Sequence, residues 1–112
     1  MKVAIIGSRK YENRRRIQEF IYKLKEKWGD KLEIVSGGQR DGADGYAKKY
    51  ALEFDLNYSE PYAVWHYHSR NKDLIEYSDV VVAFIPKGVT SKGTNSALKE
   101  ANKKEKKYVI IN

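Results

Sequence analysis

Glycines and small polar residues gather in three short segments, each shortly after an apolar run. The first segment is Gly7-Ser8-Arg9, the second spans 36–44 and the third spans 88–94. Glycine accepts positive φ and lets backbone N–H groups approach an anion closely. A helix amino terminus adds partial positive charge, and the second and third segments both lead into predicted helices. The three segments therefore have the composition of phosphate-binding loops.

Side chains in and near these segments add donors and cations. Ser91, Thr94 and Asn95 can donate hydrogen bonds, whereas Lys92 and Arg9 can neutralise negative charge. Arg70 and Asn71, early in a helix predicted at 65–77, can reach the site formed by these segments. Arginine binds phosphate bidentately. The residues predicted to bind the ligand are Gly7, Ser8, Arg9, Ser36, Gly37, Gly38, Gly42, Asp44, Arg70, Asn71, Ser91, Lys92, Gly93, Thr94 and Asn95.

Each of these residues also has a purely structural interpretation. Glycines at strand ends often serve tight turns, and Asp41 or Thr94 can be a plain N-cap. Arg70 can form a surface ion pair with Asp73 or Glu76. The convergence of three such loops on one sheet edge nevertheless favours a ligand site over three unrelated turns. Their spacing matches neither the dinucleotide fingerprint nor a P-loop.

Two carboxylates keep an enzymatic hypothesis open. Hydrolysis of an N-glycosidic bond needs a carboxylate that stabilises the oxocarbenium-like transition state or activates water. Asp41 and Asp44 are the catalytic candidates, because a spacing of three at the start of a helix predicts similar faces. Glu60 is a weaker candidate. Asp41 can instead cap the helix, and Asp44 can instead orient a loop or bind a ribose hydroxyl.

The chain offers little for a metal site. It has no cysteine, which excludes disulfides, thiolate ligands and a cysteine nucleophile. His66 and His68 are two residues apart near the start of a predicted helix and so do not share a face. Tyr62 and Trp65 either stack on a base or pack in the core. We therefore predict no metal and no resident cofactor.

The elements that must position the three segments alternate between strands and helices. Short apolar runs predict strands at 2–6, 32–35, 56–59, 80–85 and 108–111, and helical periodicity predicts helices at 14–28, 43–54, 65–77 and 94–104. Such alternation implies a parallel sheet with right-handed crossovers. The predicted fold is α/β: a Rossmann-like, doubly wound, parallel five-stranded sheet with helices on both faces, in a single domain spanning 1–112.

The overall charge favours anionic ligands. Lysine and arginine number 22 against 15 acidic residues, which gives a net charge of +7. This excess makes nucleic acid an alternative partner. The basic runs at 14–16 and 103–107 contain no aromatic residues that could stack on bases, which favours a solvated surface. Without a signal sequence or an apolar run of about 20 residues, we expect a cytoplasmic protein without a membrane partner.

Several motifs occur together in an order typical of one superfamily. They are Val3–Arg9, Ser36–Gly38 followed by Gly42–Asp44, Trp65, Arg70–Asn71, Ser78–Phe84 and Ser91–Thr94. Together they resemble the SLOG superfamily over nearly the whole chain, and in particular its small YspA-like members from bacteria and phages. The resemblance implies a Rossmann-like sensor or binding module for AMP, ADP-ribose or an NAD-derived molecule. It also implies self-association, which is common among the relatives.

Relatives within that superfamily define the competing functions. By resemblance to the Lonely Guy phosphoribohydrolases, Gly37 and Gly38 face the ligand, Arg70 contacts a nucleotide phosphate, and the segment 91–94 replaces a Pro-Gly-Gly-x-Gly-Thr loop. Those enzymes place a glutamate three residues after the loop threonine, where this chain has Ala97; Glu100 lies nearly one helical turn further on. Enzymatic activity as a nucleotide N-glycosidase therefore stays an alternative to binding alone. DNA binding, as in the DprA/Smf relatives, is a second alternative.

Overall fold

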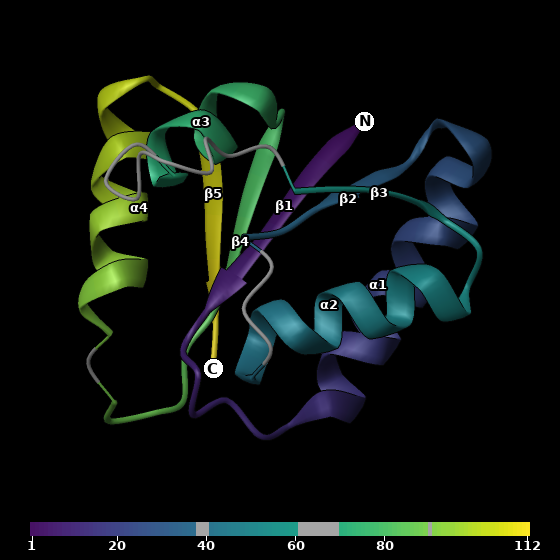
Figure 1. Ribbon diagram of the computed structural model, residues 1–112, viewed down its shortest axis with the longest axis horizontal. Helices are drawn as coiled ribbons and strands as arrows, with labels where there is room; N and C mark the ends of the chain where they lie inside the picture. Colours follow the sequence, from purple (N-terminus) through teal and green to yellow (C-terminus); the bar gives the residue numbers. More distant parts are fainter. Residues whose placement is uncertain (38–40, 61–69, 90) are drawn as a thin grey trace.

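Strands and helices alternate along the chain in the computed structural model, which describes residues 1–37, 41–60, 70–89 and 91–112 (Figure 1). In chain order the elements are β1 (Lys2–Gly7), α1 (Arg14–Trp28), the 3-10 turn η1 (Gly29–Lys31), β2 (Glu33–Val35), α2 (Gly42–Glu53), β3 (Asn57–Ser59), α3 (Arg70–Tyr77), β4 (Val80–Phe84), α4 (Lys92–Lys103) and β5 (Lys107–Ile111). The predicted order of elements is confirmed. The predicted beginning of the third helix, 65–69, lies outside the described residues.

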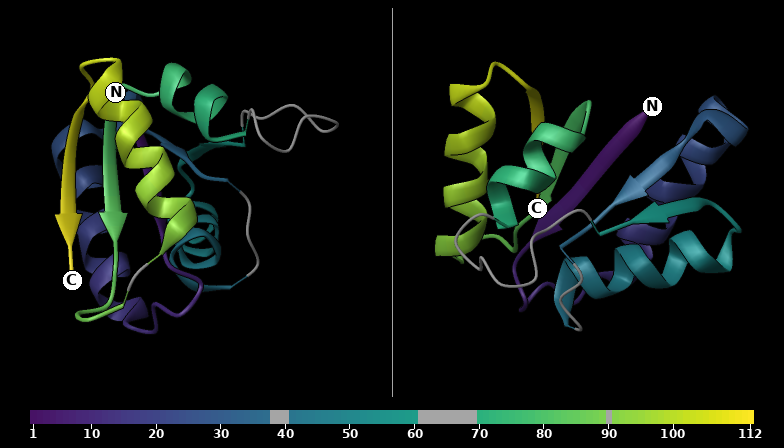
Figure 2. Two further views of the ribbon diagram at one scale, coloured as in Figure 1. Left: turned by 90° about the vertical axis from the view of Figure 1, so that its left-hand side faces the viewer. Right: turned by 45° about the horizontal axis from the view of Figure 1, so that its top comes forward.

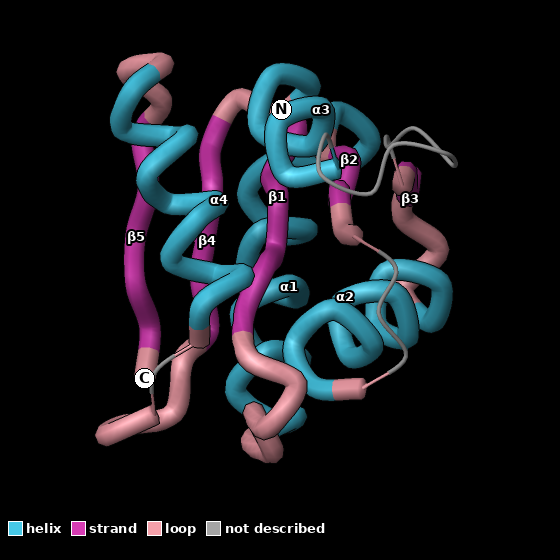
Figure 3. The backbone as a smooth tube through the Cα atoms, turned by 60° about the vertical axis from the view of Figure 1, so that its left-hand side comes forward, coloured by secondary structure: helices cyan, strands magenta, loops and turns pink. Residues whose placement is uncertain are grey.

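All neighbouring strands in the sheet are parallel. Their order is β3-β2-β1-β4-β5, which can be followed across Figure 3. The chain moves outward from β1 through β2 to β3, then returns to place β4 on the other side of β1. Strand order therefore reverses between β1 and β4. In open sheets of this kind, ligands bind beyond the carboxyl ends of the strands at that reversal.

Helices cover both faces of the sheet, as predicted for a doubly wound fold. One core lies under α1 and α2 and the other lies under α3 and α4. The central strand β4 belongs to both, because Val82 and Phe84 pack into the first core whereas Val81 and Ala83 pack into the second. This arrangement explains why the run at 80–85 is apolar at every position.

The first helix shows how local sequence determines the bounds of an element. Asn13 precedes α1, and its side-chain Oδ1 accepts a hydrogen bond from the N–H of Arg16 at 3.3 Å. At the other end Gly29 has a φ of 54°, a conformation that favours glycine. Both ends of the helix lie where the sequence predicts them.

In the part of the chain that is described, no helix is long and apolar enough to cross a bilayer.

Candidate functional site

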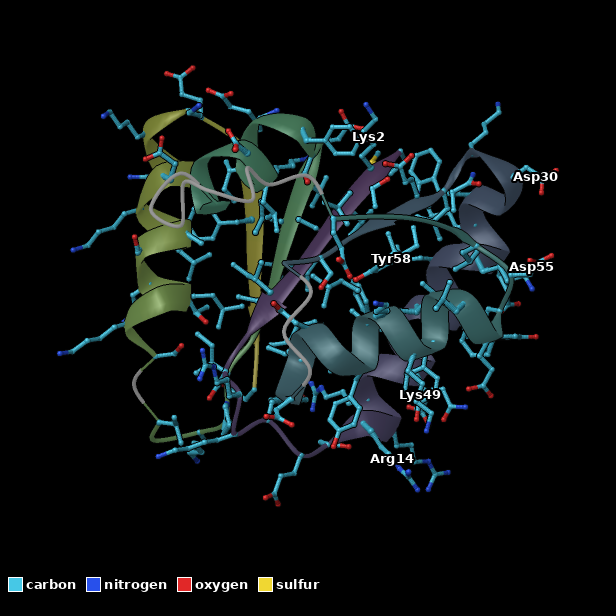
Figure 4. The ribbon with its side chains drawn as sticks, in the orientation of Figure 1. Lys2, Arg14, Asp30, Lys49, Asp55 and Tyr58 are labelled. Atoms are coloured by element: carbon cyan, nitrogen blue, oxygen red, sulfur yellow. The ribbon has the colours of Figure 1, made fainter. Side chains whose placement is uncertain are left out.

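The three predicted ligand segments lie at the same edge of the sheet. Gly7 is paired with Phe84 of β4, and Ala4 is paired with Val35 of β2, so β1 ends between its two neighbours. Helices α2 and α4 also begin at this carboxyl edge (Figures 1 and 2). Lys2, the first residue of β1, marks the opposite end of the sheet in Figure 4.

The first segment is bound tightly to the start of α2. The Ser8 carbonyl oxygen accepts hydrogen bonds from the N–H groups of Tyr11 at 3.1 Å and Ala43 at 3.3 Å. The N–H of Ser8 donates to the Phe84 carbonyl, and its side-chain oxygen accepts from Lys10 N–H, both at 3.1 Å. Ser8 is buried, and the protein itself engages its backbone groups. In this segment, Arg9 is the predicted ligand residue whose side chain is exposed.

Two glycines make this close packing feasible. A Cβ atom on Gly42, whose φ is 69°, would lie 2.2 Å from the Ser8 carbonyl oxygen. A Cβ atom on Gly7 would lie 2.2 Å from the Phe84 carbonyl oxygen and 2.7 Å from the Ala43 Cβ. The structural interpretation therefore accounts for both glycines, which allow the first loop and α2 to touch.

The two candidate catalytic aspartates lie in different surroundings. Asp41 is at the N-cap position of α2 with an extended backbone, but its side chain makes no capping hydrogen bond and is exposed. Asp44 is in the first helical turn and only 8% exposed. The helix begins at Gly42, so Asp41 precedes it and the predicted pair does not consist of two helical residues. Asp41 does occupy the predicted N-cap position, although its side chain makes no capping hydrogen bond.

Asp44 is linked to the end of β2. The hydroxyl of the fully buried Ser36 donates to the Asp44 backbone carbonyl at 3.4 Å, and the Ser36 N–H donates to the Ser59 carbonyl at 3.1 Å. Ser36 therefore ties together β2, β3 and the first turn of α2. A carboxylate in a first turn is also stabilised by the helix dipole, which gives Asp44 a structural role in addition to any chemical one.

A polar cluster lies beside these residues, between β3 and α2, and joins the weaker candidate Glu60 to two residues that sequence analysis missed, Tyr58 and Lys48 (Figure 4). The Tyr58 hydroxyl donates to Glu60 Oε1 at 2.8 Å, and Lys48 Nζ lies 3.4 Å from the same oxygen. Burial raises the pKa of Tyr58, and the nearby carboxylates of Glu60 and Asp44 raise it further, whereas a hydrogen bond with Ser36 acts in the opposite direction. Tyr58 therefore remains a protonated hydrogen-bond donor. The alternation of Tyr58 and Glu60 at the end of a strand was the available signal.

The third segment forms a capped and exposed helix start. The N-cap of α4 is Ser91 and not Thr94: the Ser91 Oγ accepts from the Thr94 N–H at 3.4 Å and donates to the Thr94 Oγ1 at 2.8 Å. Thr94 is buried, whereas Lys92, Gly93 and Asn95 are exposed. A Cβ atom added to Gly93 would meet no atom within 4 Å. A side chain at position 93 would therefore point into open space.

The residue at the position of the Lonely Guy glutamate is part of the core. Ala97 is 1% exposed and packs with Leu98 and Ala101 in the core under α3 and α4. Glu100 lies on the next turn, where its Oε1 is 3.9 Å from Lys104 Nζ. Neither residue brings a carboxylate to the start of α4.

Part of the basic run at 103–107 binds groups of the protein itself. Lys104 forms an ion pair with Glu76 of α3, and Lys106 Nζ donates to the Ser78 carbonyl at 2.7 Å. Lys107 is paired with Val80, the first residue of β4, so this run lies at the amino end of the sheet. The run is therefore remote from the three ligand segments.

Some predicted site residues cannot be placed. Gly38, Tyr62, Trp65, His66 and His68 lie outside the described residues. Arg70 and Asn71 form the first turn of α3, but their side chains are outside the description as well. Within the described ranges, no group of three histidine or acidic residues is arranged to hold a metal ion.

The fold and this edge together define a Rossmann-like α/β protein with loops and two helix amino termini at its topological reversal. A sequence model of the family described as "YspA, cpYpsA-related SLOG family" matches residues 1–68, more than half of the chain. The chain belongs to this family, and membership suggests nucleotide-related binding or processing. The match spans β1 to β3 with the first two segments, whereas α4 lies beyond it. No curated protein matches the chain.

Proposed function

We propose that this protein binds a phosphate-bearing nucleotide or nucleotide-derived ligand, of the AMP, ADP-ribose or NAD-derived type, and serves as a binding or sensor module. The observation that carries the proposal is the gathering of three predicted ligand segments at the carboxyl ends of β1, β2 and β4. Family membership supports it independently. The site lies on both sides of the strand reversal between β1 and β4.

The start of α4 is the proposed phosphate position. Its first turn is exposed and lies at the positive end of the helix dipole, which favours a bound anion. Lys92 on that turn and Arg9 at the end of β1 are exposed cations at the same edge, and they neutralise the phosphate charge. The segment around Ser36 and Gly37, with Asp44 behind it, holds the sugar side of the ligand.

The arrangement favours binding over hydrolysis by the Lonely Guy route. Ala97 packs a methyl group into the core at the position of the enzymes' glutamate. The carboxylate of Glu60, the weaker catalytic candidate, accepts a hydrogen bond from Tyr58 and pairs with Lys48. A carboxylate held in this way is stabilised in place and is poorly suited to activate water.

The burial of Asp44 at the ligand edge keeps N-glycosidase activity as a second candidate function. If Asp44 acts in catalysis, the protein releases free base from nucleoside monophosphates or NAD, and Asp44→Asn abolishes that release while Asp41→Asn does not. Chromatography of the reaction products measures the release. Activity that persists in Asp44→Asn would remove this residue from the mechanism.

Thermal unfolding with a ligand panel tests the binding proposal. A ligand that binds only the folded state stabilises it by RT ln(1 + [L]/Kd), which is about 2.7 kcal/mol at 100 times Kd. We expect saturable stabilisation by at least one of AMP, ADP-ribose, NAD or a cyclic relative. Lys92→Ala should weaken it, and the matched control Lys107→Ala, at the opposite end of the sheet, should not. An unmoved melting temperature across the panel would refute the proposal.

A further inference from the structure

The outermost strand, β5, carries exposed apolar side chains along the sheet edge. Tyr108 is 42% exposed, and Val109 and Ile110 are each 52% exposed. Among the described residues, the other large hydrophobic side chains of comparable exposure are Tyr22 and Leu52, on two helices. Edge strands usually carry charges, prolines or bulges that prevent pairing with another chain. From Tyr108 to Ile111 this strand carries no charge and no proline.

The backbone of β5 has one satisfied side and one open side. The Ile85 N–H donates to the Ile111 carbonyl at 2.9 Å, and Val109 is paired with Val82. Since backbone groups of successive residues point in opposite directions, those of Val109 and Ile111 face β4. Those of Tyr108 and Ile110 therefore point away from the sheet. No described strand lies on that side (Figure 2, left).

The apolar side chains continue both faces of the sheet. Val109 is in register with Val82, which packs under α1 and α2. Tyr108 and Ile110 are in register with Val81 and Ala83, which pack under α3 and α4. A strand added beside β5 would therefore extend both hydrophobic cores and cover all three exposed side chains.

We propose that this added strand is β5 of a second copy of the chain, in antiparallel orientation about a two-fold axis at Val109. In this register Val109 lies opposite Val109, and Tyr108 lies opposite Ile110 of the second copy. The outward backbone groups of Tyr108 and Ile110 then hydrogen-bond each other across the interface. An axis perpendicular to the sheet keeps both copies of α4 on one face, so the cores become continuous.

The side chains of β5 favour pairing with β5 of a second copy. An aromatic residue opposite a β-branched residue is a favourable cross-strand pair, and the register gives that pair twice. The lysines at 106 and 107 then lie opposite Asn112 and Ile111 of the second copy, so like charges do not face each other. A parallel pairing in register would instead place lysine beside lysine.

Mass measurement on the intact chain tests the dimer. Sedimentation equilibrium at about 0.15 M salt, where the repulsion between basic surfaces is screened, should show mass rising with concentration toward twice 13.0 kDa. Ile110→Lys should remain at the mass of one chain. Leu52→Lys, the same substitution at a residue 59% exposed on α2, should dimerise as the wild type does. A single-chain mass for the wild type at every concentration, or dimerisation of Ile110→Lys equal to wild type, would overturn the proposal.

A single-cysteine experiment tests the register. The natural sequence has no cysteine, so Val109→Cys introduces one thiol per chain. Opposite residues in a non-hydrogen-bonded antiparallel pair have Cα atoms about 4.5 Å apart. This separation lies within the range that a disulfide requires, about 4.4–6.8 Å. Under mild oxidation Val109→Cys should form covalent dimers much faster than Leu52→Cys. Equal rates would overturn the proposed pairing, and neither result depends on the ligand site.

Discussion

Helices α2 and α4 both begin at the carboxyl edge of the sheet, but the two starts are built differently. The start of α2 is packed into the protein, since Ala43 N–H donates to the Ser8 carbonyl and Gly42 touches the first loop. The start of α4 is capped by its own Ser91, and Gly93 faces open space. Close packing therefore explains the glycine at the start of α2, whereas a side chain would fit at the glycine at the start of α4.

At this one edge of the sheet, residues that stabilise the fold are therefore distinct from residues expected to bind the ligand. A side chain added at Gly42, at the start of α2, should destabilise the fold, because neighbouring backbone atoms leave no room. A side chain added at Gly93, at the start of α4, should spare the fold and alter ligand affinity.

The largest expected effect is that of Gly42→Ala. The new Cβ would lie 2.2 Å from the Ser8 carbonyl at a φ of 69°, so the free energy of unfolding should fall by about 3 kcal/mol or more. Gly88→Ala is the matched control, because Gly88 has a φ of 80° but no atom within 4 Å of the new Cβ. Its loss should be about 1–2 kcal/mol. Equal losses in urea denaturation would contradict the packing account.

A second pair of alanine substitutions compares the first loop with α4. In Gly7→Ala the Cβ would meet the Phe84 carbonyl and Ala43, and about 1–3 kcal/mol of unfolding free energy should be lost. Gly93→Ala should be neutral or stabilising by up to about 1 kcal/mol, because the position is helical and open. Calorimetric titration should nevertheless find weaker ligand binding by Gly93→Ala. Unchanged affinity would argue against the phosphate position at α4.

The two N-cap positions should respond differently to alanine. Ser91→Ala removes a side-chain cap and should cost about 1 kcal/mol of stability. Asp41→Ala removes no such hydrogen bond and should change stability by less than about 0.5 kcal/mol. Urea denaturation of both variants measures the contrast, and a larger loss in Asp41→Ala would reverse it.

Alkaline pH should weaken the Tyr58 cluster. Burial raises the pKa of the Tyr58 hydroxyl above its unfolded value of 10.0, so above about pH 10 the unfolded chain loses this proton first. The stability contributed by the protonated hydroxyl is fully present below pH 10 and falls as pH rises. Melting temperatures should decline less steeply over this range in Tyr58→Phe than in the wild type. Tyr22→Phe, at an exposed tyrosine, should follow the wild type; the same slope in both variants would exclude the effect.

Elements with strong local patterns could be predicted, and contacts between distant loops could not. The periodicity of α1 with its flanking Asn13 and Gly29 determines the helix bounds locally, and the apolar run of β4 reveals a strand buried on both faces. The role of Gly42 depends on its contact with Ser8, which lies far earlier in the chain. Sequence alone could not show that contact.

The aspartate pair illustrates the same limit at a helix end. Spacing predicts a shared face only if both residues are helical, and Asp41 lies one residue before the helix. The cluster of Tyr58, Glu60 and Lys48 joins β3 to α2, so its geometry required the packing of two elements. Positions on the sheet edge were predictable, whereas the surroundings of each side chain were not.

Backbone amide NMR during titration with the best ligand of the panel is the most direct test of the central claim. The account predicts saturable shifts at Arg9, Gly37, Gly93 and Thr94, with the amides of Lys31 and Lys107 at the opposite end unchanged. Shifts concentrated at that opposite end, or no shifts at the three segments under saturating ligand, would contradict a nucleotide site at the carboxyl edge.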